Sequence, residues 1–165
     1  MDLKRFLFAV ILFTIVAQIV HTLGSILAMG YYLDPAYFDV WSKIMMPTAG
    51  PPPAKFFFLS IDLGLISSII YVYAYVILEK SIPGKGWVRN GLNYGALLFL
   101  LGTLPGMLSI VLLINLPILL ILEWAAEGLI VMLIGGVMTA GLMRKEEPEA
   151  EEKKASTKKQ KKKNN

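Results

Sequence analysis

Four long apolar stretches constrain the fold of this 165-residue chain more than any other feature. They cover residues 6–29, 56–78, 92–114 and 118–143. A helix that crosses the ~30 Å hydrocarbon core of a bilayer needs about 20 predominantly apolar residues. Each stretch meets this length, and 56% of all residues are hydrophobic, which exceeds what a soluble domain of this size can bury. The sequence therefore predicts an all-α domain over residues 1–143, a bundle of four transmembrane helices.

The third and fourth stretches are separated only by Asn115, Leu116 and Pro117. Proline suits the first turn of a helix, and an asparagine before it suits a turn. We therefore expect a tight helical hairpin here. The alternative is one long segment broken at Pro105, but the combined apolar stretch is close to twice the length of one membrane crossing.

The first connection, residues 30–55, is rich in aromatic residues, which favour the membrane–water interface. Asp34 and Pro35 can begin a short interfacial helix that runs to about Met46. An ordinary loop whose aromatic rings anchor the neighbouring helices is an equally good interpretation. The interfacial anchors that we predict are Tyr31, Tyr32, Tyr37, Trp41 and, beside the third stretch, Trp87.

The distribution of Lys and Arg predicts the orientation. Fourteen of them lie in the N-terminal segment, the second connection and the C-terminal tail, whereas the first connection has only Lys43 and Lys55. Because cytoplasmic flanks carry the excess of Lys and Arg, we expect a multi-pass protein of the cell membrane with both termini cytoplasmic.

Residues 144–165 differ in composition from the rest of the chain. They carry nine Lys or Arg against five Asp or Glu, which accounts for the whole net charge of +4, and they contain no aromatic or large aliphatic residue. Such a segment cannot bury a core, so we predict a disordered, charged cytoplasmic tail. A basic tail of this kind gives no reason to expect a nucleic-acid partner.

Small residues recur at spacings of three or four in the apolar stretches. This spacing places them on one helix face, where they allow close helix–helix approach. We favour packing within the chain, with a homo-oligomer as the alternative. The glycines expected at helix contacts are Gly64, Gly91, Gly95, Gly102, Gly106, Gly128, Gly135 and Gly136.

Ionisable residues are costly inside a membrane, so each one is a functional hypothesis. A rise of ~1.5 Å per residue places those of this chain in the half of the bilayer away from the termini. They suggest a polar cavity that opens to the outer face and binds a cation, a metal ion or a polar head group. Alternatively, these groups form hydrogen bonds with one another and only stabilise the bundle. Asp62 also lies off the small-residue stripe of its helix, so it can face away from the others. The candidate lining residues are Gln18, His21, Asp62, Glu123 and Glu127.

No catalytic motif is visible in the sequence. It contains no P-loop, no HExxH and no GxSxG with partners, and the absence of cysteine excludes disulfides and thiolate chemistry. We therefore predict a protein that is not an enzyme and that uses no cofactor.

A set of residues and short motifs extends over nearly the whole chain before the tail. They are His21, Tyr31, Tyr37, Trp41, residues 84–86, residues 91–95, Pro105, Pro117, Trp124, Gly128, Gly135 and Gly136. In these positions the chain resembles an uncharacterised family of small four-helix integral membrane proteins of bacteria and archaea. The resemblance implies the four-helix arrangement and a prokaryotic plasma membrane, but no activity. The charged tail is a departure from the family.

Two functions remain open at the level of sequence. The first is a non-enzymatic membrane module that binds lipid or a partner membrane protein. The second is a small transporter or ion-binding protein that uses His21, Asp62, Glu123 and Glu127. The second hypothesis fails if His21 and at least two of the carboxylates do not line a common cavity.

Overall fold

The computed structural model describes residues 2–48 and 50–144. All regular structure in these ranges is helical, and four helices are long and apolar enough to cross a membrane. The predicted all-α architecture with four membrane-length helices is therefore confirmed. The tail predicted for residues 144–165 lies outside the described residues, except for Arg144.

The four spans agree closely with the apolar stretches. The third span is continuous but contains a π-helical segment, η3, and it begins at Trp87, directly after Gly86 with its positive φ of 81°. The fourth has the expected bounds. In chain order the spans are α1 (Leu3–Leu27), α3 (Ala54–Leu78, continued by the 3-10 turn Glu79–Ser81), α4 (Trp87–Leu98) with η3 (Phe99–Thr103) and α5 (Leu104–Leu113), and α6 (Ile118–Met143).

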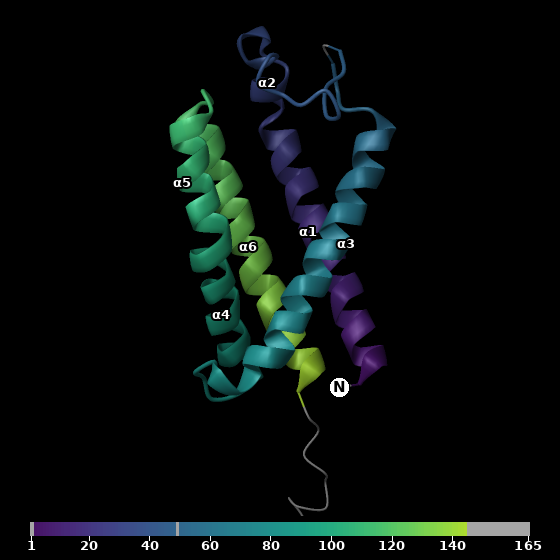
Figure 1. Cartoon of the computed structure of the whole chain (residues 1–165), viewed down its shortest axis with the longest axis vertical. Helices are drawn as coiled ribbons and strands as arrows, with labels where there is room; N and C mark the ends of the chain where they lie inside the picture. Colours follow the sequence, from purple (N-terminus) through teal and green to yellow (C-terminus); the bar gives the residue numbers. More distant parts are fainter. Residues whose placement is uncertain (1, 49, 145–165) are drawn as a thin grey trace, which may run out of the picture.

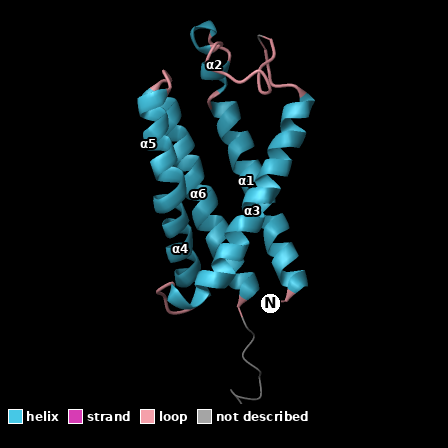
Figure 2. Ribbon diagram, viewed as in Figure 1, coloured by secondary structure: helices cyan, strands magenta, loops and turns pink. Residues whose placement is uncertain are grey.

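Both ends of the described chain lie at one end of the bundle, which we call the terminal end (Figure 1). The guanidinium of Arg5 donates a hydrogen bond of 3.0 Å to the backbone carbonyl of Arg144 there. The first connection and the α5–α6 turn lie at the opposite, distal end, and the loops are confined to the two ends (Figure 2). The tight hairpin expected around Asn115 joins α5 to α6.

In the terminal half, α4 packs directly on α6 through glycines. A Cβ atom on Gly91 would lie 2.5 Å from Cα of Val137, and one on Gly95 would overlap the backbone of Met132. Gly136 in turn lies against the backbone of Gly91 and Gly95. These three glycines lie within the chain's own helix contacts, so the two helix backbones approach each other closely.

The terminal half is closed because α3 also reaches α4 there. The hydroxyl of Tyr75 donates 2.8 Å to Oδ1 of Asn90, and the Tyr75 and Tyr94 rings meet edge to face at 5.1 Å. The hydroxyl of Tyr94 donates to the backbone carbonyl of Tyr71. Both Tyr75 and Tyr94 are buried, so this half of the bundle has a packed aromatic core.

In the distal half the third span moves away from its neighbours. A Cβ atom on Gly102 or Gly106 would meet nothing within 4 Å, so the expectation that these two glycines pack against a helix is wrong. Pro105 lacks the N–H needed for the regular helical pattern, and the π-helical segment ends at Thr103, two residues before it. Within the π-helical segment, the methyl group of Thr103 lies close to Gly128 of α6.

The first connection folds over the distal end of α6. It contains α2 (Met29–Tyr32) and a single 3-10 turn, η1 (Pro35–Tyr37), in which Asp34 accepts a hydrogen bond of 2.9 Å from the backbone N–H of Ala36. The short helix begins where we expected it but ends at Tyr37 and does not reach Met46. Irregular backbone after the turn allows Trp41 and Met46 to be buried in a cluster with Tyr32, Ala28 and Leu120.

Candidate functional site

The open distal half contains two adjoining cavities of about 580 and 660 Å3. The first lies between α1, α6 and the η3–α5 segment, and the second lies between α1, α3 and the first connection. We call the two together the distal cavity. The two cavities share the lining residues His21, Ser25, Tyr32, Tyr71, Trp124, Val131 and Met132.

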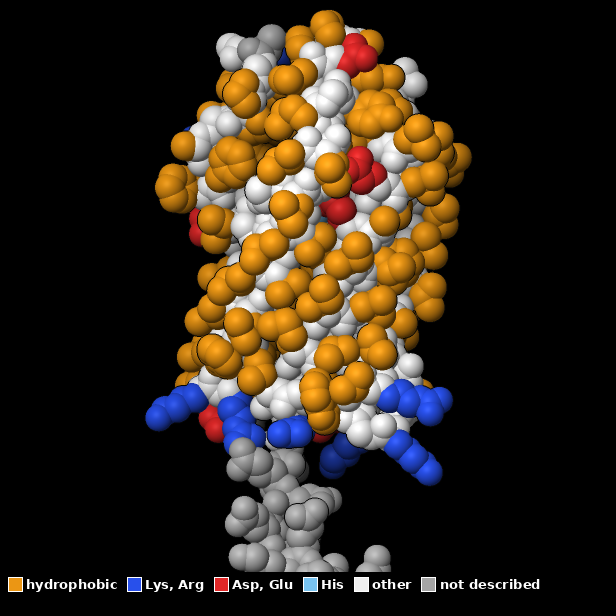
Figure 3. All heavy atoms as spheres, turned by 180° about the vertical axis from the view of Figure 1, so that it is seen from behind, with side chains coloured by type: hydrophobic (Ala, Val, Ile, Leu, Met, Phe, Trp, Pro, Cys, Tyr) orange, Lys and Arg blue, Asp and Glu red, His pale blue; other side chains and the backbone are white. Residues whose placement is uncertain are grey.

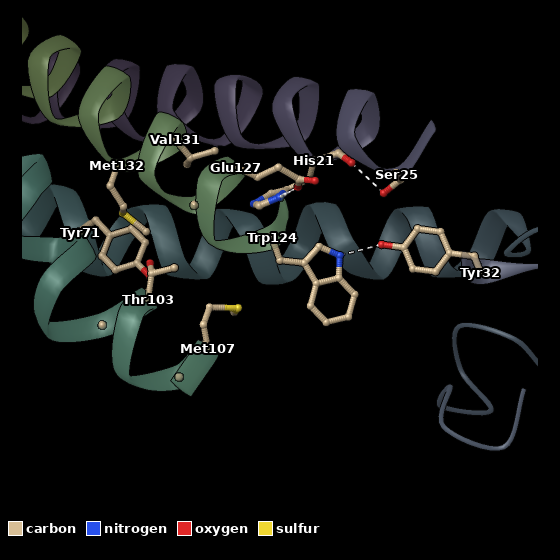
Figure 4. A pocket seen from close by; sticks show the side chains of 13 residues that line it. His21, Ser25, Tyr32, Tyr71, Thr103, Met107, Trp124, Glu127, Val131 and Met132 are labelled. Atoms are coloured by element: carbon tan, nitrogen blue, oxygen red, sulfur yellow. Dashed lines mark hydrogen bonds and ion pairs between the residues drawn. The ribbon is translucent and has the colours of Figure 1, made fainter. Parts of the chain in front are cut away.

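An imidazole–carboxyl pair lies at the wall of the distal cavity. Nδ1 of His21 on α1 and Oε2 of Glu127 on α6 are 2.8 Å apart (Figure 4). The Glu127 side chain is only 11% exposed, whereas the His21 side chain is 54% exposed. The pair therefore links two helices, and the imidazole is the member that faces open space.

Gly24 makes this pair possible, and sequence analysis missed it. A Cβ atom at position 24 would overlap the carboxyl group of Glu127. Gly24 follows His21 by three residues and so lies on the same helix face. That spacing was the only signal in the sequence, and it gains meaning only when the packing of α6 is known.

A second set of polar contacts joins α1 to α3. The buried hydroxyls of Thr14 and Ser68 lie 3.0 Å apart, and Ser60 donates a weak hydrogen bond of 3.5 Å to Oε1 of Gln18. All four residues line the second cavity. Gly64 lies in ordinary van der Waals contact with Thr14, at 3.8 Å. The polar seam expected on the first helix is thus satisfied partly by hydroxyl groups of α3.

The structure brings together only part of the predicted polar set. Gln18, His21 and Glu127 line the distal cavity, but Asp62 and Glu123 line neither of its two parts. Asp62 is exposed on α3, and no hydrogen bond or ion pair reaches it from the residues that the structure describes. Asp62 is two residues from both Ser60 and Gly64, so the helical repeat turns it to the opposite face.

The transport hypothesis therefore loses its geometric basis. It required His21 and at least two carboxylates around one cavity, and only Glu127 joins His21 there. Within residues 2–48 and 50–144, no three His, Asp or Glu side chains gather closely enough to hold a metal ion. Glu123 lies half-buried one turn from Glu127, outside the lining.

Three aromatic side chains form the distal end of the cavity. Nε1 of Trp124 donates a hydrogen bond of 2.9 Å to the hydroxyl of Tyr32. The Trp41 ring lies edge-on to both, with centroids 5.2 Å from Tyr32 and 6.3 Å from Trp124. Burial raises the pKa of the Tyr32 hydroxyl, so this group stays protonated at neutral pH. These contacts hold the first connection on α6.

The remaining predicted anchors lie at the bundle ends. Tyr31 and Tyr37 pack partly buried against the Trp41 cluster. Trp87 lies at the terminal end, where its ring approaches Gly141 and the Arg144 guanidinium is 6.0 Å from the ring centroid. The aromatic residues of the first connection thus close the cavity from one side, and Trp87 fixes the start of α4 on α6.

Comparisons with family models, with curated proteins and with solved structures found no match to this chain. The resemblance to small four-helix membrane proteins of bacteria and archaea therefore stays a prediction. The described residues that line the distal cavity are mainly apolar and aromatic, with a few hydroxyls, one amide, one imidazole and one carboxyl group, and they include no Lys or Arg.

Proposed function

We propose that this chain is a non-enzymatic, multi-pass membrane protein that binds a lipid or similar amphiphile in its distal cavity. The observation that supports this most strongly is a cavity of ligand size between the membrane-length helices, which combines apolar walls with a polar pair. Ligand sites typically have volumes of about 300–1,000 Å3, apolar linings and a few placed polar groups. The distal cavity, with His21 and Glu127 on its wall, fits this description.

The charge distribution supports a cell-membrane location with both termini in the cytoplasm. On the face in Figure 3, Lys and Arg gather at the terminal end, and an apolar wall rises above them. At the distal end, the only Lys or Arg side chains among the described residues are Lys43 and Lys55. By the positive-inside rule, the distal cavity would then lie in the outer half of the bilayer. The described Lys and Arg residues at the terminal end of the bundle are Lys4, Arg5, Lys80, Lys85, Arg89 and Arg144.

Binding of lipid is favoured over binding of a partner membrane protein because the distal cavity is concave and its polar groups point inward. Bilayer amphiphiles surround such a cavity at very high local concentration. A partner helix or a homo-oligomer would instead use an outer helix face, such as the one on which the carboxyl group of Asp62 is exposed. More residues therefore support lipid binding in the cavity than support a partner on an outer helix face.

The test is to purify the protein in dodecyl maltoside and measure retained lipid by native mass spectrometry. Gly106→Leu projects a side chain into the first cavity at a position where nothing lies within 4 Å, so it should reduce lipid retention without disturbing packing. Gly30→Leu is the matched control, since Gly30 also has open space around it but lies outside the lining. Equal lipid retention by the two variants would contradict the proposal.

A further inference from the structure

We propose that the His21–Glu127 pair selects an amphiphile whose head group is a primary ammonium. This inference rests on the proposed function and adds the chemistry of the ligand. It follows from the hydrogen-bonding state of the pair, from the charge of the cavity lining and from the room available for an alkyl chain.

The hydrogen bond within the pair determines what the imidazole offers to a ligand. In the state in which Glu127 is ionised, its carboxylate can only accept hydrogen bonds, and Nδ1 of His21 then carries the proton in their 2.8 Å contact. In a neutral imidazole the other nitrogen, Nε2, is then an acceptor. Nε2 has no hydrogen-bond partner among the described residues, and the His21 side chain lines both parts of the cavity.

An acceptor in this position needs a donor from the ligand. A primary ammonium provides three N–H donors on a compact positive charge. One N–H can donate to Nε2 of His21, and the imidazole then lies between the ammonium and the carboxylate of Glu127, which bonds to the other ring nitrogen. A hydroxyl head group could supply the hydrogen bond but not the charge, and a quaternary ammonium could supply the charge but not the hydrogen bond.

The charges of the lining favour the same ligand class. Among the residues that the structure describes, Glu127 is the only carboxylate that lines either part of the cavity, and no Lys or Arg lines it. A charge within a low-dielectric environment is strongly destabilised unless an opposite charge compensates it. An ammonium compensates Glu127, whereas a phosphate or sulfate head group would meet a carboxylate and find no cationic side chain.

Aromatic rings and thioethers complete the site. Tyr71 and Trp124 line both parts of the cavity, and a cation near an aromatic face gains further stabilisation. Met107, Val131 and Met132 extend the first cavity with apolar surface. This surface provides a path for an alkyl chain that starts at the His21–Glu127 pair.

The test compares four ligands that share a ten-carbon chain and differ only in the head group: decylamine, decyltrimethylammonium, decanol and decyl sulfate. The full chain in dodecyl maltoside micelles carries Trp87→Phe, so that Trp41 and Trp124, both in the cavity lining, report binding by fluorescence. We expect decylamine to bind about tenfold more tightly than each of the other three.

Matched variants separate the pair from general electrostatics. Glu127→Gln should reduce decylamine binding to the level of decanol, whereas Glu123→Gln, one turn away and outside the lining, should leave the preference unchanged. His21→Gln provides a second variant, because it removes the Nε2 acceptor and keeps the Glu127 carboxyl group. Loss of the decylamine preference in His21→Gln and Glu127→Gln, but not in Glu123→Gln, supports the inference.

Four results would overturn it. Equal binding of decylamine and decyltrimethylammonium would show that Nε2 of His21 does not receive a hydrogen bond from the ligand. Equal loss in Glu123→Gln would assign the preference to long-range charge. Equal affinity for all four ligands would also reject the ammonium selectivity while leaving amphiphile binding intact, and no binding of any ligand would reject both.

Discussion

The carboxyl group of Glu127 on α6 occupies the space that a Cβ atom at position 24 of α1 would need. Glu127 can therefore extend across the helix interface and meet Nδ1 of His21 at 2.8 Å. Gly24 thus controls the polar contact that His21, one turn away on the same helix, makes with Glu127. Because this contact lies at the wall of the distal cavity, position 24 links helix packing to the proposed ligand site.

Gly24→Ala should separate His21 from Glu127. The added methyl group overlaps the carboxyl group, so either the side chain of Glu127 rotates or α1 and α6 move apart. We expect a loss of about 1–3 kcal/mol in stability from overpacking and from the broken hydrogen bond. Thermal unfolding in dodecyl maltoside measures this loss. Gly30→Ala is the control, because its Cβ would meet nothing within 4 Å, and equal stability of the two variants would contradict the role of Gly24.

The contrast between two glycine pairs in the third span gives a second prediction. Gly95→Ala places a methyl group against the backbone of Met132, which cannot move aside, whereas Gly106→Ala projects into open space. We expect Gly95→Ala to destabilise the bundle by about 2 kcal/mol or more and Gly106→Ala to be nearly neutral. Unfolding midpoints of the two variants in the same detergent provide the measurement. Similar losses would mean that the third span packs along its whole length.

These two glycine pairs also show where sequence reasoning stops. Gly91 with Gly95 and Gly102 with Gly106 have the same four-residue spacing, and the sequence treats them alike. Only the first pair contacts α6. The π-helical segment Phe99–Thr103 lies between the two pairs and interrupts the regular α-helical repeat, so the same spacing does not place the second pair on the same face. Such a change depends on tertiary packing, so a repeat in the sequence cannot locate it.

Helix positions, in contrast, follow directly from the apolar stretches. The helix Ile118–Met143 begins directly after Pro117 and ends where the charged residues start. The faces of the helices are harder to predict, because a membrane helix is apolar all around and has little amphipathic pattern. Asp62 illustrates this: its depth suggested a place in the cavity, but its direction on α3 excludes it.

Asp62 and Glu127 should respond in opposite ways to replacement by leucine. Asp62 is exposed and has no partner among the described residues, so Asp62→Leu removes a polar group that membrane burial disfavours. We expect the unfolding midpoint to rise by about 2–4 °C or to stay unchanged. Glu127→Leu breaks a hydrogen-bonded pair and should lower the midpoint.

The oligomeric state of Asp62→Leu provides a further check. If the variant is less stable than the parent, or if it converts a dimer to a monomer in size-exclusion chromatography with light scattering, Asp62 contacts a partner. This result would favour the homo-oligomer or partner-protein alternative over an exposed, unpartnered carboxyl group. Unchanged mass together with equal or higher stability agrees with the structure.

The absence of cysteine makes the topology directly testable. A single cysteine at Ser42, in the first connection, should react with a membrane-impermeant maleimide in intact cells, because the proposed orientation turns the distal end outward. A single cysteine at Ser81, which follows α3 at the terminal end, should react only after the membrane is opened. Both serines lie outside the cavity lining, so neither change should affect ligand binding. The reverse labelling pattern would place the His21–Glu127 pair in the inner half of the bilayer and would exclude outer-leaflet amphiphiles as its ligands.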